Sequence, residues 1–194
     1  DAVPMAYLAG AHLRMGDLAA AATAATAAVS IDPTNHLANS YLAYVRLAQG
    51  DVDAAVAAGA IAVDNAPASG AAHEALGTAQ FFGGNLNAAR DSLSEALRLA
   101  PLSAGAHLTM AKLLAADDDI DAALGEAETA VGLNPQSAPA RSTLGLLFLL
   151  NKDEWRAGRE FEIRIRRTRP TTTRRLEPCP CQTLPTVLRR FVPG

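Results

Sequence analysis

The stretch "GNLNAARDSLSEALRLAP", Gly84 to Pro101, decides the fold because it is one of three similar copies in the chain. The other two begin 34 residues apart, as "GDLAAAATAATAAVSIDP" from Gly16 and "GDVDAAVAAGAIAVDNAP" from Gly50. Each copy starts with glycine followed by Asp or Asn, has alanine at the same two inner positions and ends in proline. A period of this length indicates repeated supersecondary units.

The same period continues outside the three copies. Prolines recur at Pro33, Pro67, Pro101 and Pro135, and helix-capping residue types recur at Asp17, Asp51, Asn85, Asp119 and Asp153 and at Asn35, Ser69, Ser103 and Ser137. Asp, Asn and Ser cap helix N-termini because their side-chain oxygens accept hydrogen bonds from free backbone N–H groups. Two capping positions per period therefore predict two helices. The glycine suits a turn with positive φ between them, and the proline stops the second helix.

These positions divide the chain into five helical repeats and a tail. The predicted repeats are residues 1–35, 36–69, 70–103, 104–137 and 138–169, and the tail is residues 170–194, which we expect to be mostly disordered. The high alanine content and the 5% of aromatic residues favour an all-α chain. The longest strongly apolar run, residues 144–150, is far shorter than the roughly 20 residues that span a bilayer.

Small residues mark where the helices approach each other. They recur in the middle of each first helix at Ala9, Ala43, Gly77, Ala111 and Gly145, and early in each second helix at Ala21, Ala55, Ala89, Ala123 and Ala157. Small side chains allow helix axes to approach to the short end of the usual range of about 8–10 Å. The sequence therefore predicts an all-α solenoid of about five helix-turn-helix units.

The whole pattern resembles the tetratricopeptide repeat (TPR) of bacterial proteins, over residues 1 to about 168. It has the 34-residue period, a Leu-Ala or Leu-Gly pair in the first helix, Gly-Asp in the turn, two alanines in the second helix and a terminal proline. The resemblance implies a right-handed superhelix whose concave groove, lined by the first helices, binds a peptide or helix of a partner protein.

The sequence departs from the family pattern at two positions. The aromatic residue near the start of the first helix is replaced by Asn39, His73, His107 and Arg141. The bulky position in the middle of the second helix holds only Ala25 and Gly59 in the first two repeats. We expect loose packing there, because missing side-chain volume either leaves a cavity or forces the helices to collapse.

Residues i, i+4, i+7 and i+11 of each first helix are expected to face the groove. The candidate partner-binding residues on or beside this stripe are Tyr7, Arg14, Tyr41, Tyr44, Glu74, Thr78, Phe82 and Lys112. All three tyrosines of the chain lie on it, and tyrosine suits partner recognition because it combines an apolar ring with a hydrogen-bonding tip. Alternatively, the tyrosines only cover the seams between repeats. Some co-chaperone members of the family grip a C-terminal carboxylate with a Lys/Asn/Arg clamp. The matching positions here hold Ala6, Gly10, Tyr44 and Ala75, so the sequence lacks the clamp and does not predict this function.

No motif predicts catalysis, a metal site or a cofactor. His73 and His107 share a repeat position but have no further ligand at zinc spacing, and the acidic run from Asp117 to Asp121 lacks the glycine and distal glutamate of a calcium loop. Cys179 and Cys181 lie apart from the helical body, which therefore needs no disulfide. This usage fits a cytoplasmic protein, and a periplasmic one whose signal peptide has been removed is the alternative.

Charge separates the end of the chain from the body. Residues 1–151 contain 6 Lys+Arg and 15 Asp+Glu, a net charge of −9, whereas residues 152–194 contain 11 and 5, a net charge of +6. In the last repeat, Trp155, Gly158, Phe161 and Ile165 form one apolar stripe at helical spacing, which we expect to pack on the array. The opposite side is then expected to face water, as a terminal repeat requires, and it carries Arg156, Arg159, Glu160, Arg166 and Arg167.

The first hypothesis for function is thus a non-catalytic protein-interaction scaffold. Asp153, Phe161, Glu162 and Arg164 also resemble the end of bacterial TPR arrays that precede a glycosyltransferase-like domain, which implies a substrate-presenting or regulatory arm of a larger enzyme as a second hypothesis. A third is a basic tail that binds nucleic acid or an anionic membrane. The alternative to this third hypothesis is that the tail is inert, or that it results from truncation or a frame error in the gene. The sequence leaves the oligomeric state open.

Overall fold

The computed structural model describes residues 1–168, with side chains as far as Glu162. This part of the chain forms ten helices and no strand, as predicted for an all-α solenoid. The first helices are α1 (Ala2–Met15), α3 (His36–Ala48), α5 (Gly70–Phe82), α7 (Ala104–Ala116) and α9 (Ala138–Leu150). The second helices are α2 (Leu18–Ile31), α4 (Val52–Asn65), α6 (Leu86–Leu99), α8 (Ile120–Leu133) and α10 (Glu154–Thr168). The predictions for the tail and for Cys179 and Cys181 lie outside the described residues.

The helices begin at the capping residues that the sequence predicts. For example, the Asp51 carboxylate accepts a hydrogen bond from the backbone N–H of Ala54 at 3.2 Å, and the Asn35 side chain accepts one from Ala38 at 3.0 Å. The same contact is made by every predicted cap, which are Asp17, Asn35, Asp51, Ser69, Asn85, Ser103, Asp119, Ser137 and Asp153. Each bond satisfies a backbone donor that the helix itself leaves unpaired.

The turn inside each repeat contains one residue with positive φ. In the first three repeats this residue is Gly16, Gly50 or Gly84, with φ of 78°, 81° and 75°. In the last two repeats the same position is occupied by Asp118 and Lys152, with φ of 64° and 59°. The last two repeats therefore keep the same turn conformation without glycine, at a steric cost that glycine avoids.

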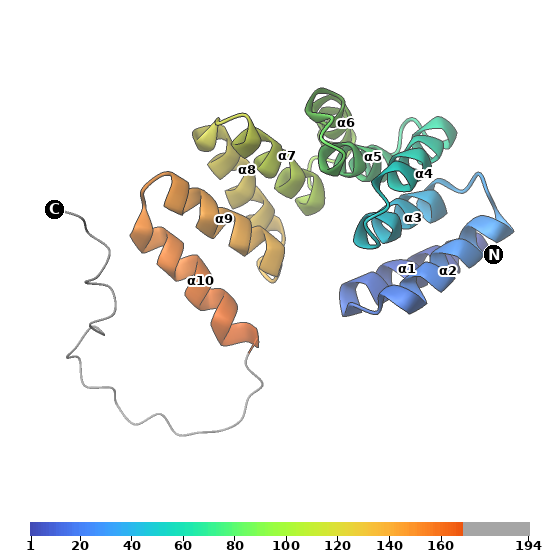
Figure 1. Cartoon of the computed structure of the whole chain (residues 1–194), viewed down its shortest axis with the longest axis horizontal. Helices are drawn as coiled ribbons and strands as arrows, with labels where there is room; N and C mark the ends of the chain where they lie inside the picture. The colour runs from blue at the N-terminus through green and yellow to red at the C-terminus, as the bar shows by residue number, and fades with distance from the viewer. Residues whose placement is uncertain (169–194) are drawn as a thin grey trace, which may run out of the picture.

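Figure 1 shows the helix pairs stacked side by side into an arch, with α1 and α2 at one end and α9 and α10 at the other. Each helix packs on its neighbours in sequence, and each first helix also packs on the first helix of the next repeat. Over the described residues, no two second helices bring their Cα atoms within 8 Å of each other. The array therefore has a continuous first-helix face, formed by α1, α3, α5, α7 and α9, and a second-helix face with gaps between successive helices.

Small residues form most of the core, as predicted, and at Ala25 and Gly59 the missing volume is closed by collapse and leaves no loose packing. Ala25 is fully buried, and a Cβ placed on Gly59 would lie 2.8 Å from the Cα atom of Leu76 in the next repeat. The helices have moved together where the bulky side chain is missing. The larger buried side chains, Leu93, Leu113 and Leu147, lie in the later repeats.

The four polar residues that replace the family's aromatic residue share one structural role. Each bonds to the backbone carbonyl of the proline six residues earlier, and the pairs are Asn39 with Pro33, His73 with Pro67, His107 with Pro101 and Arg141 with Pro135, at 2.8 to 3.0 Å. In the last two repeats the same side chain also contacts a glutamate of the second helix. His107 Nδ1 lies 2.5 Å from Glu126, and Arg141 donates to Glu160 at 2.6 Å. These side chains therefore tie the turn that joins two repeats to the helices that follow it.

The apolar stripe predicted for α10 is only partly correct. Ala157 is fully buried and Phe161 packs on Gly145, but Trp155 is 69% exposed and Gly158 is also exposed. The side of α10 that packs on the array is the one that carries Ala157. This residue is at the same repeat position as the buried alanines of the other second helices. Glu160 lies on the arginine-rich side expected to face water, but it is partly buried against Arg141. The side chain of Ile165 lies outside the described part.

Candidate partner-binding site

The eight candidate residues all lie on the first helices, but their surroundings differ. Tyr7 and Phe82 are 58% and 57% exposed, and Arg14 is also exposed. The other five are partly buried, namely Tyr41, Tyr44, Glu74, Thr78 and Lys112. No hydrogen bond or ion pair among the described side chains joins Arg14 to the other seven. That these residues bind a partner stays a prediction.

Tyr41 covers the seam between the first two repeats. Its ring lies against Gly10, where a Cβ would come within 2.7 Å of the ring atom Cζ. It also meets the ring of Tyr7 edge to face, with 6.4 Å between the ring centroids. Tyr41 therefore serves mainly in packing, and it holds the exposed ring of Tyr7 at the edge of the first-helix face.

Tyr44 and Glu74 form a hydrogen-bonded link from α3 through α5 to Ser103, which caps the start of α7. The Tyr44 hydroxyl donates to Glu74 Oε1 at 3.0 Å, and the other carboxylate oxygen accepts from the hydroxyl of Ser103. Burial, together with the negative charge of Glu74, raises the pKa of Tyr44 well above its usual range. The phenol therefore stays protonated and keeps donating to Glu74 at neutral and mildly alkaline pH. Thr78 continues the link along the face, since its Oγ1 lies 3.4 Å from that of Thr109.

An apolar pocket opens beside this link, between α3 and α5. It has a volume of about 480 Å³, and its lining residues are Tyr44, Leu47, Ala48, Gly50, Val52, Thr78 and Phe82. Three of them, Tyr44, Thr78 and Phe82, are candidates from the sequence. The pocket is large enough for one large apolar side chain of a partner, and binding pockets are typically apolar with a few polar groups.

Lys112 lies at the edge of this region on α7. Its ammonium nitrogen lies 5.9 Å from the centroid of the Phe82 ring, within range of a cation–π interaction. Burial lowers the pKa of Lys112 from its ordinary value. Among the described residues no carboxylate forms an ion pair with Lys112. The side chain thus offers a cation beside an exposed aromatic ring on the same surface as the pocket.

The sequence missed part of this surface. Leu47 and Val52 line the pocket but lie outside the predicted stripe. Leu146 and Leu150 of α9 are 56% and 61% exposed and continue the first-helix face into the last repeat. Leu146 and Leu150 could have been found from the period, since they lie 34 residues after Lys112 and Ala116, which are stripe positions of the fourth repeat.

The residues considered for metal binding have structural roles. His73 and His107 bond to proline carbonyls, and Asp119 caps α8. Asp117 forms an ion pair with Arg90. Within residues 1–162, no three His, Cys, Asp or Glu side chains come together in a way that could hold a metal ion. None of the described helices has the length and apolar character needed to cross a membrane.

This geometry defines an α-solenoid made of helix-turn-helix repeats, with an apolar pocket on its first-helix face. The family model described as "Tetratricopeptide repeat" matches residues 8–70, 42–104 and 74–138. The chain therefore belongs to the tetratricopeptide repeat family. Comparison with curated protein sequences gave no significant match.

Solved structures share the fold at low sequence identity. The thermophilic TPR protein TTC0263 of Thermus thermophilus has a TM-score of 0.75 and 22% identity, over 87% of this chain and 92% of that chain. PilF of Pseudomonas aeruginosa has a TM-score of 0.66 and 16% identity, over 85% and 75%. YrrB, described as a TPR protein with an unusual peptide-binding site, has a TM-score of 0.55 and 19% identity, over 87% of each chain. At these identities the likeness shows the fold alone.

Proposed function

We propose that the chain is a non-catalytic scaffold that binds a segment of a partner protein along its first-helix face. The observation that carries the proposal is the apolar pocket between α3 and α5, which is bordered by the exposed ring of Phe82. TPR arrays bind protein or peptide partners on such extended surfaces, and YrrB is a structural neighbour described as having a peptide-binding site.

The contacts around the pocket suggest what the partner carries. An apolar side chain would fill the space beside Phe82 and Val52, where binding removes apolar surface from water. Lys112 forms no ion pair with a carboxylate of the described residues. It would therefore pair with an acidic residue of the partner segment. The proposed ligand is therefore an extended peptide with an apolar residue close to an Asp or Glu.

Phe82 is a better residue to test than the tyrosines. Removing Tyr44 would leave the Glu74 carboxylate without one of its donors, so a loss of binding could come from a local rearrangement. Phe82 is mostly exposed and its loss should leave the array intact. Leu102, which is 78% exposed in the turn before α7 and is not among the pocket residues, provides a matched control.

The experiment is selection of peptides from a random displayed library against the purified chain, followed by affinity measurements on selected synthetic peptides. We expect the peptides to share an apolar residue near an acid, and Phe82→Ser to weaken their binding about ten-fold or more, as for an interface anchor. Leu102→Ser should leave affinity unchanged, with circular dichroism confirming that both variants are folded. Peptides that bind the Phe82→Ser variant as tightly as the unmodified chain would exclude this surface as the binding site.

A further inference from the structure

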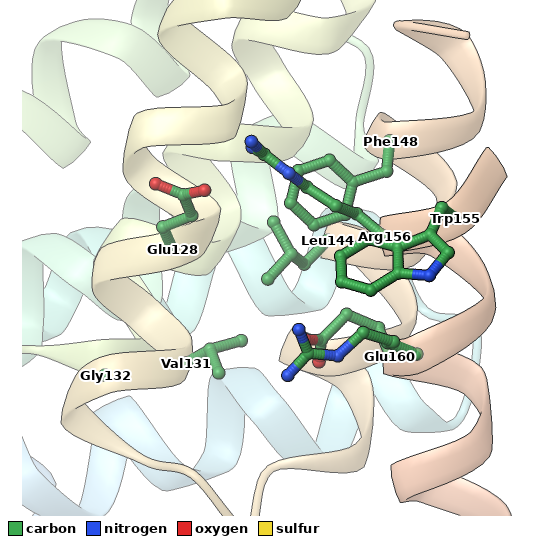
Figure 2. A pocket seen from close by; sticks show the side chains of 9 residues that line it. Glu128, Val131, Gly132, Leu144, Phe148, Trp155, Arg156 and Glu160 are labelled. Carbon is green, nitrogen blue, oxygen red and sulfur yellow. The ribbon is translucent and has the colours of Figure 1, made fainter. Parts of the chain in front are cut away.

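A second pocket lies on the opposite side of the last two repeats, between the second helices α8 and α10. It has a volume of about 350 Å³, and its lining includes Val131, Leu144, Phe148, Trp155 and Arg159. Figure 2 shows Glu128 and Val131 on the α8 side, Trp155 and Arg156 on the α10 side, and Leu144 and Phe148 of α9 between them. The space exists because no Cα atoms of α8 and of the described part of α10 lie within 8 Å of each other, and side chains of α9 form its floor.

The residues that build this pocket are particular to the last repeat. One period earlier, the positions of Trp155, Arg156 and Arg159 are occupied by Asp121, Ala122 and Gly125. Helix α10 also differs in charge, since it has five arginines and three glutamates, whereas α8 has three acidic residues and no basic one. Of the five second helices, α10 alone has a net positive charge.

The two arginines of the pocket are held over aromatic rings. The Arg159 guanidinium lies 5.0 Å from the Trp155 ring centroid, and that of Arg156 lies 5.6 Å from the Phe148 ring centroid. Stacking leaves the N–H groups at the edge of the guanidinium free to bind a carboxylate through two parallel hydrogen bonds. It also reduces the side-chain entropy that is lost when a ligand binds.

The nearby carboxylates leave Arg159 available. Asp153 pairs with Arg156 at 3.2 Å, and Glu160 pairs with Arg141 at 2.6 Å. Within the part whose side chains are described, Arg159 has no carboxylate partner. Glu128 faces the pocket from the α8 side and would repel an anion there, so an acidic ligand would place its carboxylate toward α10.

Trp155 has no packing role that explains its position. It is 69% exposed, while the described part of α10 packs on the apolar core through Ala157 and the partly buried Phe161. An exposed tryptophan beside an unpaired arginine is typical of interface anchors, in which both residue types are enriched.

We propose that this pocket is a second protein-binding site, which takes an acidic segment of a partner: its carboxylate pairs with Arg159 and a neighbouring apolar side chain covers Leu144 and Phe148. Complementary charge selects this occupant, because α10 is the positive second helix of an otherwise acidic array. The site is separate from the pocket beside Phe82 and does not depend on it.

The only tryptophan of the chain reports on this pocket directly. The probe is a capped peptide with the sequence leucine-glutamate-phenylalanine-aspartate, and its control has glutamine and asparagine in place of the two acids. We expect the acidic peptide to shift the fluorescence emission of Trp155 to shorter wavelength, with saturation and with weaker binding at higher salt. The amide peptide should give little change.

Arg159→Gln should weaken the acidic peptide about ten-fold or more, because a charge-assisted bidentate contact is lost. Arg98→Gln, a matched change at an exposed arginine of α6, and Phe82→Ser should both leave its affinity unchanged. An equal response to the amide peptide, no response at millimolar peptide, or loss of the response in Phe82→Ser would overturn the proposal. An emission shift that depends on protein concentration alone and is abolished by Arg159→Gln would also overturn it, since the occupant would then be a second copy of this chain.

Discussion

The second and the fifth repeat solve the same packing problem in opposite ways. Gly59 of α4 and Phe161 of α10 occupy one position of the period, three repeats apart. At Gly59 the backbone of α5 approaches so closely that a Cβ would lie 2.8 Å from the Cα atom of Leu76. At Phe161 a large ring instead lies over Gly145 of α9, within 2.9 Å of where a Cβ would be. One repeat fills the space with backbone and the other with a side chain.

This comparison extends to the whole array. The residue in the middle of the first helix and the residue 16 positions later form the pairs Ala9–Ala25, Ala43–Gly59, Gly77–Leu93, Ala111–Ala127 and Gly145–Phe161. Where the first helix has alanine the second has a small residue, and where it has glycine the second has a large one. Protein interiors are close-packed, so what stays within limits from repeat to repeat is the summed volume of the two side chains. The size of either residue alone varies.

The largest effect is expected from Gly59→Leu, which places the bulky residue of the family pattern into the second repeat. Its Cβ would meet backbone atoms of α5, which cannot move aside as a side chain can. Overpacking of this kind costs about 3 kcal/mol of the free energy of unfolding. Denaturant unfolding followed by circular dichroism measures it.

Gly125→Leu is the matched control, because a Cβ on Gly125 would meet nothing within 4 Å apart from its chain neighbours and its own helix backbone. It should leave stability unchanged or raise it by up to about 1 kcal/mol, since leucine is the better helix former. If Gly59→Leu were as stable as Gly125→Leu, the close approach of α4 and α5 would not be a constraint on this position.

A smaller loss, of about 2 kcal/mol, is expected from Phe161→Ala, because the ring is only partly buried at the end of the array. The stability of a solenoid is roughly a sum of local terms, so hydrogen exchange should accelerate in α9 and α10 and stay unchanged in α1 to α4.

The double variant Gly145→Ala with Phe161→Ala tests the complementarity itself. It recreates the alanine pair of the fourth repeat, so we expect it to recover about 1 kcal/mol of the loss. A double variant less stable than Phe161→Ala alone would show that the two positions do not compensate each other.

Much of the fold could be predicted from the sequence, because capping and turn residues act locally and recur with the period. Asp51, for example, caps α4 whatever surrounds it. The packing at Gly59 could not be predicted from the sequence, because it depends on how closely the helix of the next repeat approaches. The exposure of Trp155 was missed for a related reason: its apolar character suggested burial, whereas the side of α10 that packs is fixed by the register of Ala157.

The candidate site shows the same limit of periodicity. The stripe of the first helices contains Tyr44, Thr78 and Phe82, which border the pocket. It does not contain Leu47 and Val52, because the pocket lies where the end of α3, the turn after it and α5 meet. Periodicity predicts which residues share a face, while a pocket depends on the distances between helices.

The turns of the early and the late repeats differ in whether glycine occupies the position with positive φ. Lys152→Gly tests this difference. Lys152 has φ of 59°, a conformation that costs a residue with a Cβ about 1 kcal/mol, so the glycine found at this place in the first three repeats should recover about that amount. Lys152→Ala removes the charge but keeps the Cβ, so it should give no such gain in a thermal or denaturant titration. A similar gain from both variants would assign the effect to charge.

Asp118→Gly should give the smallest gain, about 0.5 kcal/mol, because the short polar side chain of aspartate tolerates positive φ better than lysine does. Charge contributes here as well, since Asp118 stands between Asp117 and Asp119 and the substitution removes a repulsion. Asp118→Asn separates the two causes: asparagine keeps a Cβ and tolerates the same φ but is neutral. If backbone strain dominates, Asn gains less than Gly and salt has little effect on the difference between them. An Asn variant as stable as the Gly variant, with both gains reduced at high salt, would mean that the turn of the fourth repeat differs from the glycine turns in charge and not in strain.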